Sequence, residues 1–306
     1  MVGYALKRLL QAIPALFIIS VVIFLLMHLS PGDPTYLITG PMASAEVYER
    51  TRQRLGLDEP LPAQYWKFIS RVAVGDLGES LLYRAPVTRL LGERIGNTIL
   101  LGLSSMLVCY AIGIPAGIFA AVRRGTSADA VVMILATIGM GIPSFWLALV
   151  LISVFAVSLS LLPASGYDAG LRSLVLPALT LGVVEAAVLT RLTRSSMLES
   201  LRADYTRTAR AKGLHPQRVL WVHTFRNALL PILSFFGLQI GFILSGAVVV
   251  ETVFAWPGVG RLLVDSIVNR DFPVAQGVLL VTGFAIILGN LLADLLYRLA
   301  DPRIKS

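Results

Sequence analysis

The chain has 306 residues, of which 56% are hydrophobic and only 14% are charged, and its formal net charge is +8. A soluble chain of this length would form roughly two domains and carry about 25% charged residues. The composition therefore argues against a soluble globular protein and predicts an all-α, polytopic membrane protein. The single cysteine, Cys109, cannot form an intramolecular disulfide, and the three histidines lack metal-ligand spacing. We expect no metal site and no cofactor.

Six apolar runs are long enough to cross a membrane, since a bilayer core ~30 Å thick requires about 20 helical residues. The first is not a secretory signal, because the turn-forming segment Ser30–Pro34 follows it in place of a small-residue cleavage site. We expect it to be a retained span. The six runs are Leu9–Leu29, Thr98–Ala121, Ala130–Leu162, Leu174–Leu192, Ala228–Val250 and Gln276–Leu299.

The segment between the first two spans predicts short helices on the outer side. Ser44–Gly56 reads as a helix with Ser44 as its N-cap and Gly56 past its end. Pro62–Val74 has amphipathic spacing, Gly75–Gly78 forms a turn, and Pro86–Ile95 leads to the second span. Two interpretations stay open, a helical cap on the membrane surface and a contact surface for something outside.

The number of spans depends on Ala130–Leu162, which is longer than one bilayer and contains the potential break Gly139–Pro143. A double crossing would place the basic stretch Arg191–Arg226 outside. A single crossing places it inside, as the positive-inside rule requires, and leaves Arg172, Arg261 and Arg270 in the short outer loops. The sequence therefore predicts six spans, a kinked and tilted third helix, and both termini on the cytoplasmic side.

Two residues near or within the spans invite a closer interpretation. Glu185 lies in the middle of the fourth span, where a carboxylate costs on the order of 3 kcal/mol. It either lies on a possible translocation path, where it would contact a cationic group, or is a buried carboxyl at an interface between two membrane subunits. Trp256 precedes Pro257 in an outer loop, where we expect an interfacial anchor.

The inner loop before the fifth span has the sequence pattern of a short helix with a defined stop. Asp204 suits the first helical turn, Arg210 and Lys212 suit the last, and Gly213 suits the left-handed position after the end. Pro216 then opens a second helix that returns into the fifth span. Such a rigid unit is suited to transmitting motion from a docked partner, whereas scattered basic residues alone would be a topology signal.

This loop resembles the cytoplasmic coupling loop of the permeases of ABC importers, above all those of the dipeptide, oligopeptide and nickel subfamily. The resemblance rests on Thr208–Gly213 and Arg226–Pro231. Further similar pieces follow in the same order along nearly the whole chain, namely Ser30–Pro34, Leu55–Leu61, Gly75–Ser80, Leu162–Gly166, Phe254–Arg261, Arg270–Val274 and Asp301–Ile304. The chain departs from the general permease motif in having Arg207-Thr208-Ala209 where that motif has Glu-Ala-Ala, as the peptide-type subfamily does.

The resemblance implies a type I importer permease in the cell inner membrane. It implies three kinds of partner: a second homologous permease, two ATP-binding cassette subunits and an extracytoplasmic solute-binding protein. We expect an N-terminal region at 1–96, a permease domain at 97–300 and a coupling loop at 194–227. The expected ATPase-coupling residues are Asp204, Tyr205, Arg207, Thr208, Ala209, Arg210, Lys212 and Gly213.

The function expected from the resemblance is ATP-driven import of di- or oligopeptides, and uptake of glutathione or of nickel and other metal chelates is the alternative within the subfamily. The sequence contains no G-x-x-x-x-G-K-[ST] phosphate loop, so we expect ATP hydrolysis to reside in the partners and the chain not to be an enzyme. A stand-alone secondary transporter would require an inverted repeat and several midplane charges, which are not visible here. We expect no role in binding nucleic acid.

Overall fold

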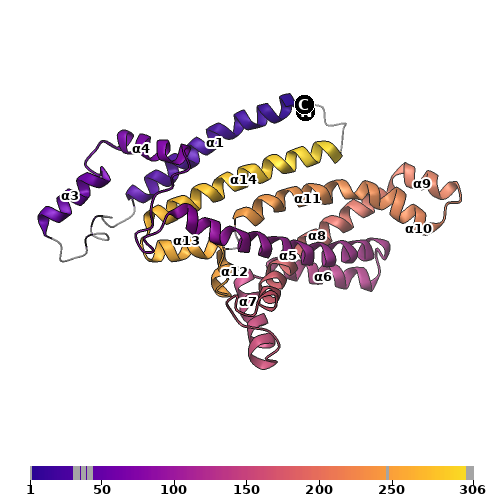
Figure 1. The fold of residues 1–306 in the computed structure, drawn as a ribbon. Helices are drawn as coiled ribbons and strands as arrows, with labels where there is room; N and C mark the ends of the chain where they lie inside the picture. Colours follow the sequence, from indigo (N-terminus) through magenta and orange to yellow (C-terminus); the bar gives the residue numbers. More distant parts are fainter. Residues whose placement is uncertain (1, 30–34, 36–38, 40–43, 246–247, 301–306) are drawn as a thin grey trace.

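The computed structural model describes all residues except 1, 30–34, 36–38, 40–43, 246–247 and 301–306. The described part is built from helices, and its only β pairing is an isolated bridge between Glu79 and Pro86. The long helices run alongside one another, and the shorter helices lie at the ends and along the side of the bundle (Figure 1). The expected all-α class is therefore confirmed. The sequence pieces Ser30–Pro34 and Asp301–Ile304 lie outside the described residues.

The N-terminal helices form an arm beside the bundle (Figure 1). Helix α3 begins after Ser44, whose Oγ accepts a hydrogen bond from the Val47 N–H, and ends at Gly56 with φ of +70°, so both predicted caps are confirmed. Helix α4 packs on α1 through a 2.8 Å hydrogen bond between Ser20 and Tyr65 and through ring contacts with Phe24. The bounds are α1 Val2–Leu29, α3 Ala45–Leu55 and α4 Leu61–Ala73.

Two long helices, α5 (Val87–Val122) and α8 (Leu171–Arg202), pack along each other at the centre of the bundle. Helix α5 joins the predicted segment Pro86–Ile95 to the second span without a break. The two helices approach so closely that a Cβ added to Gly117 would lie 2.5 Å from the Cβ of Thr193. Glycine at this position allows the backbones to touch, as small residues do between membrane helices.

The third predicted span is two helical pieces that meet at the predicted break Gly139–Pro143, and the bend between them is much sharper than the expected kink. Helix α6 (Ser127–Gly141) and the unit formed by α7 (Ser144–Leu151) and the π-helical turn η1 (Ile152–Ser158) differ in direction by 103°. The reason is local. Pro143 disfavours the helical conformation in the residue before it, and Ile142 is extended, with φ of −79° and ψ of 121°.

The C-terminal half contains the inner loop and the outer helices. The helix that contains the fifth predicted span begins at Pro216, and the described residues Pro216–Gln239 are long and apolar enough to cross a membrane. The elements are α9 Asp204–Ala211, α10 Pro216–Arg218, the π-helical turn η2 Val219–Phe225, α11 Arg226–Ser245, α12 Val248–Val253, α13 Val259–Val268 and α14 Phe272–Ala300.

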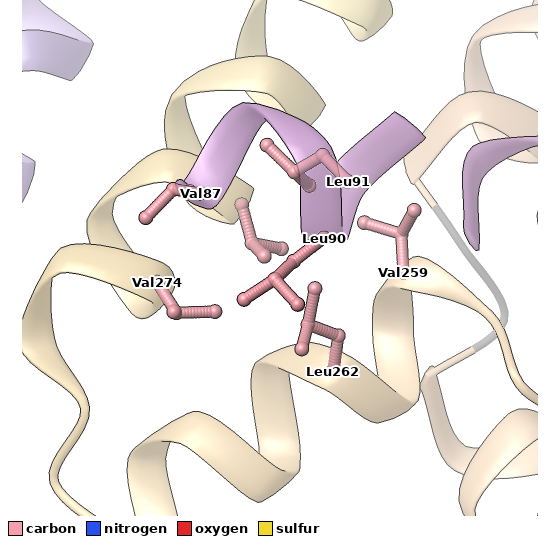
Figure 2. Close-up of a cluster of buried hydrophobic side chains, with 7 residues drawn as sticks. Val87, Leu90, Leu91, Val259, Leu262 and Val274 are labelled. Carbon is pink, nitrogen blue, oxygen red and sulfur yellow. The ribbon is translucent and has the colours of Figure 1, made fainter. Parts of the chain in front are cut away.

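A compact apolar core closes the end of the bundle opposite α9. Figure 2 shows Leu90 and Leu91 of α5 facing Val259 and Leu262 of α13, with Val274 of α14 beside them. All of these side chains are buried. The core packs the start of α5 and the start of α14 against helix α13.

The described residues contain four helices that are long and apolar enough to cross a membrane, and the bent pair makes a fifth candidate. The described apolar part of α1, Ile13–Leu26, is shorter. Six spans therefore stay a prediction. Figure 1 places the beginning of α1, the end of α14 and α9 at the same end of the bundle, an arrangement consistent with the predicted topology.

Candidate coupling loop and embedded polar sites

The inner loop is a short helix with one anchored face and one exposed face. Thr206 is fully buried, and its Oγ1 donates a 2.7 Å hydrogen bond to the Ser200 carbonyl at the end of α8. Ala209 is 4% exposed and also faces the protein, so of the expected coupling residues it is the one unavailable to a partner. The others lie on the exposed side, namely Asp204, Tyr205, Arg207, Thr208, Arg210, Lys212 and Gly213.

The helix ends as its sequence predicts. Gly213 has φ of +73°, its N–H donates to the Arg210 carbonyl at 2.9 Å, and the Leu214 N–H donates to the Ala209 carbonyl at 3.4 Å. This pair of bonds is the Schellman arrangement, which satisfies the last carbonyls of a helix and reverses the chain. A Cβ on Gly213 would meet nothing within 4 Å, so the requirement for glycine comes from the backbone angle and not from space.

The returning chain contains an exposed aromatic residue that the sequence analysis missed. Trp221 lies in η2, is 50% exposed, and donates from Nε1 to the Gln217 side chain at 3.2 Å. Val222 beside it is 47% exposed. A tryptophan within a basic inner loop was the available signal, since exposed aromatic residues are enriched where proteins bind partners.

Arg194 of α8 forms an ion pair, although the sequence analysis considered this arginine only as part of the basic stretch that sets the topology. Its guanidinium donates two bonds of 2.6 and 2.7 Å to Asp129 of α6, whose side chain is 6% exposed. Asp129 also accepts from the Gly125 N–H at 3.0 Å. Bidentate pairs of this kind are strong and directional. The pair therefore locks the turn between α5 and α6 to the helix that leads into the inner loop.

Glu185 is half-buried between α8 and its neighbours. The Nε2 of Gln239, on α11, donates to the Glu185 carboxylate at 3.3 Å and also lies 3.7 Å from the buried sulfur of Cys109 on α5. The structure thus brings together one predicted residue and two that the sequence analysis did not connect with it.

Glu251 is a second embedded carboxylate, and sequence reasoning missed it entirely. It is fully buried, accepts from the Thr98 hydroxyl at 2.8 Å and from the Arg261 N–H at 3.0 Å, and so caps the first turn of α13. A Cβ on Gly258 would lie 2.3 Å from its carboxyl carbon. The available signal in the sequence was the spacing of Glu251, which stands just before the piece Phe254–Arg261 and seven residues before Gly258.

The outer pieces that carried the resemblance meet in space. Trp256 is fully buried, and its Nε1 donates to the Asn97 carbonyl at 3.0 Å, so the expected interfacial anchor is wrong because the ring fills the core instead. Asp271, which is 1% exposed, accepts bonds from the Ser80 hydroxyl and from the N–H groups of Leu81 and Leu82 at 3.1 and 3.2 Å. These contacts join segments about 160 to 190 residues apart.

The described residues contain no group of three or more histidine, cysteine or carboxylate side chains that would hold a metal ion. A cavity of about 700 Å³ opens at the outer end and is lined by residues of α3, α4, the 76–84 segment and α14. It contains both basic and acidic side chains, including Arg71, Arg84, Asp76 and Glu79.

Comparison with known proteins gives a consistent result along the chain. Residues 113–306 match the family described as binding-protein-dependent transport system inner membrane component, and residues 1–101 match the family of its N-terminal part. The chain is 47% identical over 305 residues to the glutathione transport system permease protein GsiC of Escherichia coli K12 and equally to that of Shigella dysenteriae Sd197. Each alignment covers 100% of this chain and 99% of the relative.

The fold also resembles a solved transporter. An inward-facing structure of the MetNI methionine ABC transporter aligns with a TM-score of 0.59 and 20% identity, covering 69% of this chain and 96% of the other. At this identity the likeness concerns the fold alone. The expected type I importer fold is confirmed. By sequence and fold together, the chain belongs to the family of binding-protein-dependent transport system inner membrane components, the permeases of ABC importers.

Proposed function

We propose that this chain is the membrane-spanning permease subunit of an ATP-driven importer of glutathione or similar short peptides. The observation that carries the substrate class is the 47% identity, over the full length of both chains, to permeases named for glutathione transport. Nickel or another metal chelate is the alternative within the subfamily. The absence of a histidine, cysteine or carboxylate cluster from the described residues gives that alternative no specific support here.

In the proposed transporter, partner subunits hydrolyse ATP and the helices of this chain move in response. A second homologous permease completes the translocation path, two ATP-binding cassette subunits dock on the inner loops, and an extracytoplasmic binding protein delivers the solute. The chain itself catalyses no reaction. It lies in the inner membrane with both termini in the cytoplasm, and the domain division at 96–97 marks the start of the permease domain.

Within this assembly, α9 is the part that couples hydrolysis to transport. Three features support the assignment: its anchored face binds α8 through Thr206, its exposed face carries Tyr205, Arg207 and Arg210, and its glycine stop turns the chain directly into η2 and α11. A push on the exposed face would therefore move α8 and α11 together. Rigid-body movement of packed helices of this kind is one way in which transporters alternate between states.

Reconstitution of the whole transporter tests the proposal. The two permeases, the ATP-binding cassette subunits and the binding protein are placed in vesicles, with ATP on the side of the inner loops and labelled glutathione on the other. We expect ATP-dependent accumulation of the label, reduced by unlabelled short peptides and unaffected by a nickel chelate. ATP-dependent uptake of nickel that peptides do not reduce would contradict the substrate class.

A further inference from the structure

The environment of Glu185 contains more hydrogen-bond acceptors than the protein satisfies. The carboxylate is half-buried and, among the described residues, receives one hydrogen bond, the 3.3 Å bond from Gln239 Nε2. Gln239 is 7% exposed, yet its Oε1 has no hydrogen-bond partner among the described residues, and neither does the buried hydroxyl oxygen of Tyr110. Tyr110 packs against the apolar cluster that includes Ala186, the residue after Glu185, so oxygen-bearing side chains of α5, α8 and α11 lie in one region with bonding capacity left over.

The two other embedded carboxylates, which have structural roles, receive more hydrogen bonds than Glu185 does. Glu251 is fully buried and is bonded by Thr98 and by backbone N–H groups, and Asp129 holds a bidentate arginine. Within a bilayer, unsatisfied polar groups are costly, and an ionisable residue that keeps such groups faces a pathway or a partner. Glu185 differs from Glu251 and Asp129 in burial and in the number of donors it receives.

The chemistry of the three side chains selects the ligand. A carboxylate and an amide oxygen accept hydrogen bonds only, and a phenol oxygen accepts as well as donates. An ammonium group presents three N–H donors and one positive charge, which matches three acceptors of which one is anionic.

We propose that Glu185, Gln239 and Tyr110 form a contact site inside the membrane for the protonated amino group of the solute during its passage. The proposal rests on the proposed function and specifies which part of the peptide the permease itself recognises. It also connects recognition to coupling. Glu185 lies on the helix that enters the inner loop and Gln239 on the helix that leaves it, so both side chains belong to helices joined by α9.

The site is tested by comparing the uptake of two peptides that differ only in their amino group, and not by the total uptake of one peptide. The complete reconstituted transporter is given a tripeptide and its N-acetyl derivative, a pair first selected by calorimetry so that the binding protein holds both. Uptake of each is measured at saturation for the wild type, for Glu185→Gln and for the control Glu251→Gln. We expect Glu185→Gln to lower uptake of the free tripeptide about tenfold, the effect of one charge-assisted bond, and to change uptake of the acetylated one less than twofold.

Two other results of this selectivity experiment would contradict the proposed site. An equal loss for both peptides, or no loss for either, would overturn the proposal, since the first indicates a carboxyl that holds the two permeases together and the second an idle residue. Glu251→Gln should lower both equally. If Glu185→Gln does not reach the membrane, Tyr110→Phe supplies the same selectivity measurement, with a smaller expected loss confined to the free tripeptide. A wild-type transporter that imports neither peptide would instead refute the proposed function itself.

Discussion

At the scale of single residues, hydrogen-bond satisfaction separates the embedded acids by role. Glu251 binds Thr98 and the N–H of Arg261, and the Val259 N–H in turn donates to Thr98 at 2.8 Å. One carboxylate thereby ties α5, α12 and α13 together at the outer end. Such a network stabilises strongly because removing one member leaves the others buried without partners.

We expect Glu251→Gln to destabilise the protein by about 1–3 kcal/mol, because the new amide N–H₂ faces groups that are themselves donors. The thermal midpoint of the purified protein in detergent should fall, and Thr98→Val should lower it as well. Glu93→Gln, at an exposed position in the same outer region of α5, is the matched control and should leave the midpoint unchanged. An unchanged midpoint in Glu251→Gln would show that the buried network contributes nothing to stability.

Gly213 provides the second prediction at this scale. Replacing it with valine forces a β-branched residue into the left-handed region, at a cost of about 1–3 kcal/mol, and misdirects the return into η2. We expect Gly213→Val to insert normally but to lose transport. Gly213→Asn is the control, because asparagine tolerates this backbone angle and space is open around the position. Normal uptake by the valine variant at wild-type abundance would contradict the role of the stop.

At the scale of elements, α9 combines a fixed inner face with a charged outer face. Its only described ion pair, Arg207 with Asp204 at 3.7 Å, is highly exposed and contributes little to stability. The exposed charges of this helix are therefore available to a partner. Trp221 and Val222 of η2 extend the exposed surface with apolar area.

Reversing one of these charges should separate docking from folding. We expect Arg210→Glu to reach the membrane in normal amount but to bind the ATP-binding cassette subunits weakly and to lose transport. Arg124→Glu, an identical charge reversal at the exposed turn between α5 and α6, is the control and should retain both. Co-purification of the subunits with each variant provides the measurement. Full transport by Arg210→Glu would show that the basic residues of the loop set the topology and do not take part in docking.

The orientation of the elements across the membrane is tested by cysteine labelling. Cys109 is buried and should react little, so single added cysteines report on their own positions. We expect a cysteine at Val74, which is 81% exposed in the outer arm, to react with an impermeant reagent in intact cells. A cysteine at His215 should react only after permeabilisation. Labelling of position 215 from outside would refute the predicted topology.

At the scale of the whole molecule, we expect the chain to form part of the translocation path and its partners to hydrolyse ATP. The sequence lacks a phosphate loop, and the described residues form helices with no strand that would support one. We expect the purified chain to show no ATPase activity. Activity should appear only when the ATP-binding cassette subunits are added. ATP turnover by the chain alone, retained through further purification steps, would contradict this division of labour.

Local rules explain how much of this architecture the sequence already determined. Apolar runs of membrane-crossing length, the Ser44 cap and the Gly56 and Gly213 stops depend on a few neighbouring residues, so the helices and the shape of the coupling loop were predictable. The side of α9 that faces a partner was not, because only packing against Ser200 shows that Ala209 and Thr206 point inward.

Tertiary structure decided what depends on residues far apart in the chain. The local sequence Gly139–Pro143 marked the break in Ala130–Leu162, but its 103° angle accompanies the packing of α6 on α8 and of α7 on α8 and α12. Trp256 looked like a surface anchor until the Asn97 carbonyl, 159 residues away, gave its N–H a buried partner. Glu185 and Gln239 are 54 residues apart, and no local pattern relates them. Local backbone preferences act over a helical turn, whereas burial and hydrogen-bond satisfaction are properties of the packed bundle.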